Sequence, residues 1–352
     1  MLTSASPQIE SRPLPRLSVM MFLQYAIWGA WLPLLWPFLT EHRGFTGEQI
    51  GNIFAMSAVG AIIAPFVAGQ IADRWFATEK FLALSHILGA ILVWQLASVA
   101  DYQTFLWLSL LYSLIYSPTL SLTNSLAMHH LDDLDRDLSR IRVWGTIGWI
   151  VVGITMAQWF ASQYPGRIYE GMGDAFRLSG ILGIVMGIYS FTLPHTPPEK
   201  KESNNATIAA LKEIRRQPLL TLFLLAIPVS CIHQFYFVHT AGFLGDIQQG
   251  DNKLAEQLTG IFGEGGGGLM TIGQMSEIIV LSLIPILSKH LNRKKLLMLG
   301  LFAYAARMAL FSFYEVVGMP GVLLGVVMHG LTFGCFIFVS FMVVDENTTS
   351  GV

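Results

Sequence analysis

The sequence predicts an all-α integral membrane protein with ten transmembrane helices. Of the 352 residues, 53% are hydrophobic and only 12% are charged, about half the charged fraction of ordinary globular domains. The mean hydropathy is +0.55. The apolar residues fall into ten runs, and each is close to the roughly 20 residues that a helix needs to cross about 30 Å of hydrocarbon.

Each predicted helix corresponds to one largely uninterrupted apolar run. The first run is longer than the apolar region of a signal peptide, so we expect it to remain as a helix rather than to be cleaved. In chain order, the runs cover residues 17–39, 49–71, 81–100, 105–127, 143–162, 178–194, 218–243, 269–288, 295–314 and 321–344.

The Lys and Arg residues predict the orientation of these helices. Sixteen of the 21 fall on the set of loops that includes the N-terminus, four fall on the opposite set, and Arg307 lies within a run. Cytoplasmic loops of membrane proteins are enriched in Lys and Arg. We therefore expect a plasma (inner) membrane protein with a cytoplasmic N-terminus.

Residues 195–217 form the longest strongly polar stretch, and Pro197 and Pro198 should stop the sixth helix. We predict an N-terminal six-helix bundle at 1–195, a cytoplasmic linker at 196–217 and a C-terminal bundle at 218–352. Only four runs follow the linker, whereas the halves of transporters are usually repeats. We therefore expect about ten transmembrane helices of a full set of 12, with the last two missing.

Several classes of function find no support in the sequence. A net charge of −2 without a basic face argues against nucleic acid as a partner. Cys231 and Cys335 both lie in apolar runs, which favours neither a disulfide framework nor a zinc site. No HExxH or GxSxG motif is present. We expect no enzyme activity, no cofactor and no metal.

Glu277 and Arg307 are the two clearest ionisable residues inside predicted helices, where charged groups are costly and usually functional. Each is about 12 Å from the same membrane face at 1.5 Å per residue, so the two could meet. Gln274 shares the helix face of Glu277. One interpretation is a structural ion pair. The other, which we favour, is that Glu277 exchanges a proton near neutral pH and that Arg307 is its partner or sets the local electric field.

Aromatic and polar side chains share a face of the first helix. Gln24, Trp28 and Trp31 follow an i, i+4, i+7 pattern. An aromatic face with one amide suits stacking on a flat ring or a sugar, although aromatic residues at this spacing also serve as packing or as an interfacial belt.

Two further helices carry candidate ligand groups. Arg142, Thr146 and Trp149 form a stripe at the start of the fifth predicted helix, where an arginine also fits the positive-inside rule. Gln234 follows Pro228 in the seventh, and a proline kink is tolerated where a helix lines a cavity.

These residues lie in phrases that resemble a known family. Gly69, Asp73 and Arg74, in the loop after the second predicted helix, match the Gly-x-x-x-Asp-Arg loop motif of the major facilitator superfamily. Within that superfamily the chain is similar to the nucleoside:proton symporter family. The similar phrases are LQYAIWGAW (23–31), YSPTLSLTNSL (116–126), IRVWGTIGW (141–149), TLPHTPP (192–198), QMSE (274–277) and ARMALFS (306–312).

The resemblance implies a twelve-helix carrier of two six-helix bundles that imports nucleosides with a proton by alternating access. Its partners would be a nucleoside, a proton and the lipid bilayer, and we expect a monomer. Carried over by motif, the central site would be lined by Arg142, Thr146, Trp149, Gln234, Gln274 and Glu277, with Arg307 beside Glu277.

Phe333 and Ile337 fall where members place an aromatic pair, often with a tyrosine first, and Phe237 falls where an asparagine can occur. Because of these departures, the resemblance does not define which sugar and which base the carrier would prefer. Two alternatives stay open: a carrier of another small polyol or sugar, and a non-transporting remnant.

Overall fold

The computed structural model describes residues 13–132, 134–198, 212–248, 253–263 and 266–348, with the backbone alone at 65–75, 134–136 and 255. Ten helices within these ranges are long and apolar enough to cross a membrane. They confirm the ten predicted runs and the all-α membrane fold. No strand occurs in the described residues.

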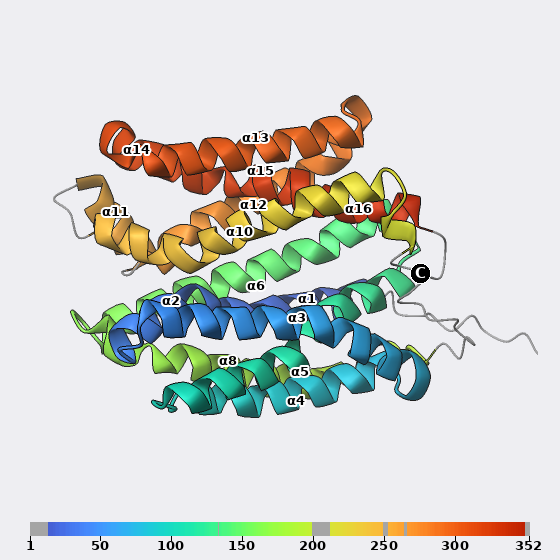
Figure 1. The fold of residues 1–352 in the computed structure, drawn as a ribbon, viewed down its shortest axis with the longest axis horizontal. Helices are drawn as coiled ribbons and strands as arrows, with labels where there is room; N and C mark the ends of the chain where they lie inside the picture. Colours follow the sequence, from blue (N-terminus) through green and yellow to red (C-terminus); the bar gives the residue numbers. More distant parts are fainter. Residues whose placement is uncertain (1–12, 133, 199–211, 249–252, 264–265, 349–352) are drawn as a thin grey trace, which may run out of the picture.

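The first six spans form one group of helices (Figure 1). The helices α1, α4, α5, α6 and α8 pack on one another, and α3 packs on α5. Their bounds are α1 Leu14–Trp31, η1 Leu32–Leu34, α2 Leu35–Pro37, η2 Phe38–His42, α3 Gly47–Trp75, α4 Thr78–Leu96, α5 Tyr102–His129, α6 Leu134–Gln163, α7 Ile168–Gly171 and α8 Gly173–Ser190.

The remaining four spans form a second group, which lies above the first in Figure 1. Here α12 and α13 pack against the successive pieces of the last span. The bounds are α10 Leu219–Gln248, α11 Lys253–Phe262, α12 Gly267–His290, α13 Arg293–Ser312, α14 Tyr314–Val327, α15 His329–Leu331, η3 Thr332–Phe338 and α16 Val339–Asn347.

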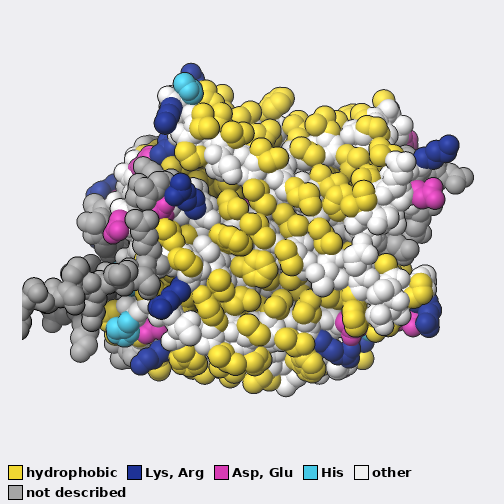
Figure 2. All heavy atoms as spheres, turned by 180° about the vertical axis from the view of Figure 1, so that it is seen from behind, with side chains coloured by type: hydrophobic (Ala, Val, Ile, Leu, Met, Phe, Trp, Pro, Cys, Tyr) yellow, Lys and Arg dark blue, Asp and Glu magenta, His cyan; other side chains and the backbone are white. Residues whose placement is uncertain are grey.

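The surface has the distribution of a membrane protein. Hydrophobic side chains cover the middle of the face shown in Figure 2, and charged side chains gather toward its two ends. Many large apolar residues are exposed, including Phe302 on α13 and Ile279 on α12. An apolar belt of this kind is stable against lipid rather than against water.

Two spans depart from a regular α-helix. In the first, Pro33 and Pro37 remove backbone donors, and short 3₁₀ and π turns continue the span to His42. In the last, Gly318 has φ 61° and ψ −170°, a conformation that glycine adopts without strain. The regular part of this span therefore begins close to the predicted residue 321.

Two expectations about element boundaries are wrong. Arg142 does not open its helix, because α6 already begins at Leu134. The loop motif is not in a loop, since the backbone of α3 stays helical through Trp75. Most of the predicted linker, residues 199–211, lies outside the described residues.

The two groups meet along α6 and α12, and α10 contacts η1 and α2. Within the first group, α6 approaches α1 very closely. A Cβ on Gly148 would lie 2.2 Å from the Phe22 carbonyl oxygen. Small residues allow such contact between membrane helices, so this glycine sets the distance between α1 and α6.

We predict that Gly148→Ala destabilises the protein by about 1–3 kcal/mol, because the added methyl group overpacks the α1–α6 contact. The midpoint of thermal unfolding in detergent measures the effect. Gly51→Ala is the matched control, since a Cβ on Gly51 meets nothing within 4 Å. Equal midpoints for the two variants would contradict the role of Gly148.

Candidate functional site

A cavity lies between the two helix groups, at the level where α1 and α6 face α10, α12 and the last span. Aromatic rings make up much of its wall, and an arginine, two glutamines, a glutamate and two histidines supply its polar groups. The lining residues are Tyr25, Trp28, Leu32, Arg142, Gly145, Thr146, Trp149, His233, Gln234, Phe237, Gln274, Glu277, His329 and Phe333.

Eight of the ten residues predicted to bind substrate line this cavity. They are Trp28, Arg142, Thr146, Trp149, Gln234, Gln274, Glu277 and Phe333. The two exceptions are Gln24 and Ile337.

Gln24 lies inside the first helix group. Its Nε2 donates a hydrogen bond to Thr119 Oγ1 at 2.8 Å, and Tyr116 donates to its backbone carbonyl at 2.7 Å. Gln24 therefore ties α1 to α5. The cavity face of the first span is instead formed by Tyr25, Trp28 and Leu32, which follow an i, i+3, i+7 pattern.

Trp31 also lies away from the cavity. It packs against Tyr112 and Phe176, with ring centroids 5.6 Å and 5.4 Å away. The bulk of the predicted aromatic face thus belongs to the core, and only Trp28 reaches the site.

Ile337 lies in a different hollow, between α10 and the end of the last span. There it packs against a buried cluster formed by Val229, Tyr304 and Phe336. Phe333 lines the cavity, whereas Ile337, four residues on, belongs to the packing of α10, α13 and η3.

Arg142 is anchored within the cavity wall. Its guanidinium donates hydrogen bonds to the Tyr25 hydroxyl and, at 3.1 Å, to Asn124 Oδ1. It also lies over the Tyr25 ring, 4.9 Å from the centroid, and 6.0 Å from the centroid of Phe333. Arg142 thus presents a fixed positive charge at the cavity rather than marking the end of a span.

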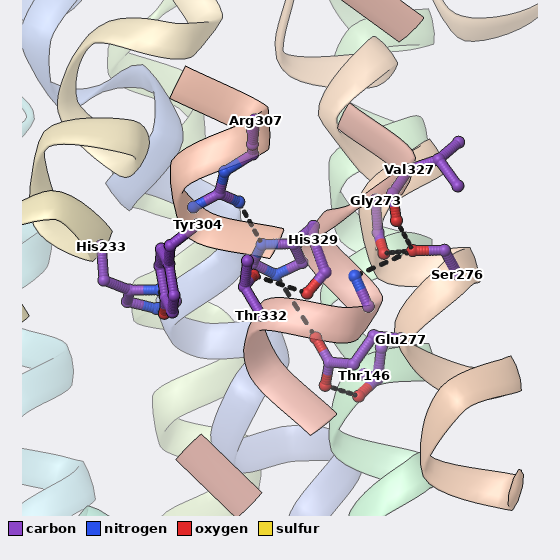
Figure 3. A network of polar contacts seen from close by, with 11 residues as sticks. Thr146, His233, Gly273, Ser276, Glu277, Tyr304, Arg307, Val327, His329 and Thr332 are labelled. Carbon is purple, nitrogen blue, oxygen red and sulfur yellow. Dashed lines mark hydrogen bonds and ion pairs between the residues drawn. The ribbon is translucent and has the colours of Figure 1, made fainter. Parts of the chain in front are cut away.

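Glu277 is buried, with 6% of the residue exposed. Its Oε1 accepts a hydrogen bond from Thr146 Oγ1 at 2.7 Å, and this contact joins α12 to α6 across the two helix groups. Its Oε2 lies 3.4 Å from Nε2 of His329 (Figure 3). The carboxylate therefore touches one residue of each group.

The expected direct contact between Arg307 and Glu277 is absent from the described residues. His329 lies between the two, with its Nδ1 3.2 Å from Nη1 of Arg307 (Figure 3). Arg307 is 0% exposed. Its guanidinium lies 4.0 Å from the ring centroid of Tyr236 and 5.2 Å from that of Tyr304, so ring faces offset part of its charge.

The two glutamines differ in their environment. Gln274 is 3% exposed, yet neither of its amide atoms has a hydrogen-bond partner among the described residues. Leaving a buried donor and acceptor unpaired costs about 1–3 kcal/mol each. Since Gln274 lines the cavity, its amide is available to a ligand that offers an acceptor and a donor. Gln234 is more exposed at the same wall.

Aromatic rings define the shape of the rest of the cavity. Trp28 meets Trp149 edge to face at 5.9 Å, and Trp149 meets Phe237 at 5.5 Å. Close packing of Gly29 on the Trp149 ring fixes that indole. These rings leave flat apolar surfaces beside the polar groups of α12.

Sequence reasoning missed Tyr25 and His329. Tyr25 was overlooked because its neighbour Gln24 was selected for its amide. His329 carries a clear signal, because it is an ionisable residue in the span of highest hydropathy, 2.2. The rule that singled out Glu277 applies equally to His329.

The structure does not test the predicted role of the Gly-x-x-x-Asp-Arg motif. The side chains of Gly69, Asp73 and Arg74 lie outside the described residues, and only the helical course of their backbone is known. Their role stays a prediction.

Comparisons with known proteins agree with this fold and identify the family. YegT of Escherichia coli (strain K12) is 32% identical over 342 residues, which cover 94% of this chain and 76% of YegT. The xanthosine permease of the same organism is 26% identical, over 96% of this chain and 80% of the permease.

Among solved structures, a variant of the nucleoside transporter NupG has the same fold, with a TM-score of 0.79 at 22% identity. The match covers 96% of this chain and 84% of the NupG chain. The family described as nucleoside H⁺ symporter matches residues 14–352. The protein is thus a transporter and not an enzyme, and the chain belongs to the nucleoside H⁺ symporter family.

Proposed function

We propose that this protein imports nucleosides together with a proton, by alternating access, and that Glu277 couples the two. The carboxylate of Glu277 is the observation that carries the proposal, because it is buried in the cavity wall and touches both helix groups. A carboxyl group in such a place changes its contacts when it gains or loses a proton. Substrate binding and proton binding can then bias the same movement of the two groups.

The lining of the cavity supports a nucleoside as the substrate. A nucleoside has a flat base, which suits the faces of Trp28, Trp149 and Phe237. The edge of a base offers hydrogen-bond donors and acceptors side by side, which suits the unpaired amide of Gln274. We assign Gln274 to the base, and Arg142 and Gln234 to the remaining polar groups of the nucleoside.

Alternating access requires a cavity that closes at one end while it opens at the other. At the α11 end the groups are packed together: Trp36 lies 4.6 Å from His239, ring centroid to centroid, and Gln158 Nε2 donates to the Ile261 carbonyl at 3.2 Å. At the opposite end, α6 and α12 are separated by a cleft of about 630 Å³ that Arg140 and Lys289 line. We assign this conformation to a state that opens toward the end with the linker.

We assign the linker end to the cytoplasm, and we propose the inner membrane as the location. Arg140, Lys289 and Arg293 line the cleft at that end, in agreement with the positive-inside rule. We further propose that residues 1–195 and 218–352 are the two moving bundles and 196–217 the linker. We also propose a monomer as the working unit.

The first prediction concerns the substrate. In cells that lack their own nucleoside uptake and express the protein from its complete gene, radiolabelled uridine should accumulate, and a protonophore should abolish the accumulation. Unlabelled adenosine should compete, and maltose should not. Competition by maltose with no effect of adenosine would favour a sugar carrier, and no uptake of either would favour a non-transporting protein.

Glu277→Gln should abolish accumulation of nucleoside against its gradient but retain part of the counterflow exchange. The amide keeps the size of the side chain but cannot take up and release a proton near neutral pH, and counterflow exchange requires no net proton release. Uptake and counterflow in reconstituted vesicles measure the two activities. Glu315→Gln, at an exposed carboxylate, is the control. Retained accumulation in Glu277→Gln would show that another group couples the proton.

Gln274→Leu should raise the KM for nucleosides about tenfold or more, the ratio that corresponds to about 1.4 kcal/mol. The leucine has a similar volume but cannot pair with the edge of a base. Gln95→Leu, at an exposed position on α4, is the matched control. An unchanged KM for every nucleoside tested would exclude Gln274 from base recognition.

A further inference from the structure

Three buried ionisable side chains from three parts of the second helix group form a continuous line. Glu277 of α12 meets His329 of α15, and His329 meets Arg307 of α13 (Figure 3). Their exposed fractions are 6%, 1% and 0%. The order of the three is significant, because a histidine between a guanidinium and a carboxylate is restricted in where it can hold a hydrogen.

Arg307 determines the protonation pattern of His329. A guanidinium has N–H donors and no acceptor. Nδ1 of His329, 3.2 Å from Nη1 of Arg307, must therefore accept and cannot carry a hydrogen. A neutral imidazole has one donor and one acceptor nitrogen, so the hydrogen of His329 is on Nε2, the nitrogen that faces Glu277.

The ring of His329 is held in this orientation by its neighbours. It stacks on Tyr236, with centroids 5.2 Å apart and planes 15° apart, and on His233, at 5.9 Å and 19°. The backbone around it is also fixed, since Ser276 Oγ accepts from the backbone N–H of Gly330 and donates to the Val327 carbonyl. A ring flip would remove Nδ1 from Arg307.

The two oxygens of Glu277 are consequently not equivalent. Oε2 faces the Nε2–H of His329, 3.4 Å from the nitrogen, so a hydrogen on Oε2 would oppose another hydrogen. Oε1 faces the hydroxyl of Thr146 at 2.7 Å. A hydroxyl can donate to a carboxylate or accept from a carboxyl group, so only Oε1 can hold a proton without losing a contact.

We propose that Arg307, acting through His329, directs the transported proton to Oε1 of Glu277. That this proton is the transported one rests on the proposed function, whereas the tautomer of His329 follows from geometry alone. On release, the O–H bond at Oε1 breaks, the proton passes to solvent water through the cavity, and the Thr146 hydroxyl turns to donate to the carboxylate. On loading, these changes reverse. Arg307 and His329 are positioning residues for this step.

Other titratable groups also face this line. Arg142 of α6 approaches from the cavity side, with Tyr25 of α1 as its hydrogen-bond partner. His233 and Tyr236 of α10 stack on the imidazole, and Tyr304 of α13 hydrogen-bonds Nδ1 of His233 at 2.8 Å. Because His233 is a second histidine at the site, the experiment must separate its titration from that of His329.

The tautomer can be tested by NMR on the full protein with ¹⁵N-labelled histidine. We expect the His329 imidazole to stay neutral with its hydrogen on Nε2 from about pH 5 to 8, the range in which histidine ordinarily titrates. Loss of the signal in His329→Gln assigns it. A hydrogen on Nδ1, or a protonated His329 in this range, would overturn the proposal whether or not the protein transports nucleosides.

The effect on coupling is tested by the pH profile of nucleoside uptake in Arg307 variants. Arg307→Lys keeps a donor without an acceptor and should keep the tautomer and the profile. Arg307→Met removes the donor, so His329 should titrate and a second step should enter the profile at acid pH. Arg167→Met, at an exposed pair, is the control. A parallel loss of uptake at every pH in both Arg307 variants, with the His329 tautomer unchanged, would show a merely structural role.

Discussion

The arrangement of the second helix group is governed by the free-energy cost of burying ionisable groups where neither water nor lipid can solvate them. An unpaired charge at membrane depth is destabilising by several kcal/mol. Here Glu277, His329 and Arg307 satisfy one another in part, and ring faces of Tyr236 and Tyr304 offset the charge of the guanidinium. The last span breaks its α-helical course in this region, and His329 lies at that break. The packing of the second helix group is thus arranged around these charges.

The same constraint links the two groups. Thr146 of α6 provides the hydrogen bond to Glu277 from across the cavity, and α6 is held close to α1 by Gly148. A change in the protonation of Glu277 therefore acts at the contact on which the relative position of the groups depends. This is the structural basis on which a proton gradient and substrate binding could drive one movement.

The sequence was sufficient for the ten spans, because long apolar runs have few alternatives in a bilayer. It also identified the polar groups of α6 and α12, since Thr146, Gln274 and Glu277 are conspicuous in apolar surroundings. It failed where the outcome depended on rotation by a single residue or on packing that spacing alone does not show. Gln24 and Tyr25 are adjacent, and only packing against α5 decides which faces the cavity. Ile337 was assigned to the cavity by its motif position, whereas it packs against Val229, Tyr304 and Phe336. Arg307 was paired with Glu277 on depth alone, and depth does not show that His329 lies between them.

The most direct test of the account is the movement of protons that uridine itself causes. The full-length protein is reconstituted into vesicles with a pH-sensitive dye inside, with no initial gradient of proton or potential. Uridine added outside should acidify the interior as each nucleoside carries a proton inward, and Glu277→Gln vesicles should exchange preloaded uridine without acidification. Uridine entry without acidification in the wild-type protein would contradict proton coupling through this site.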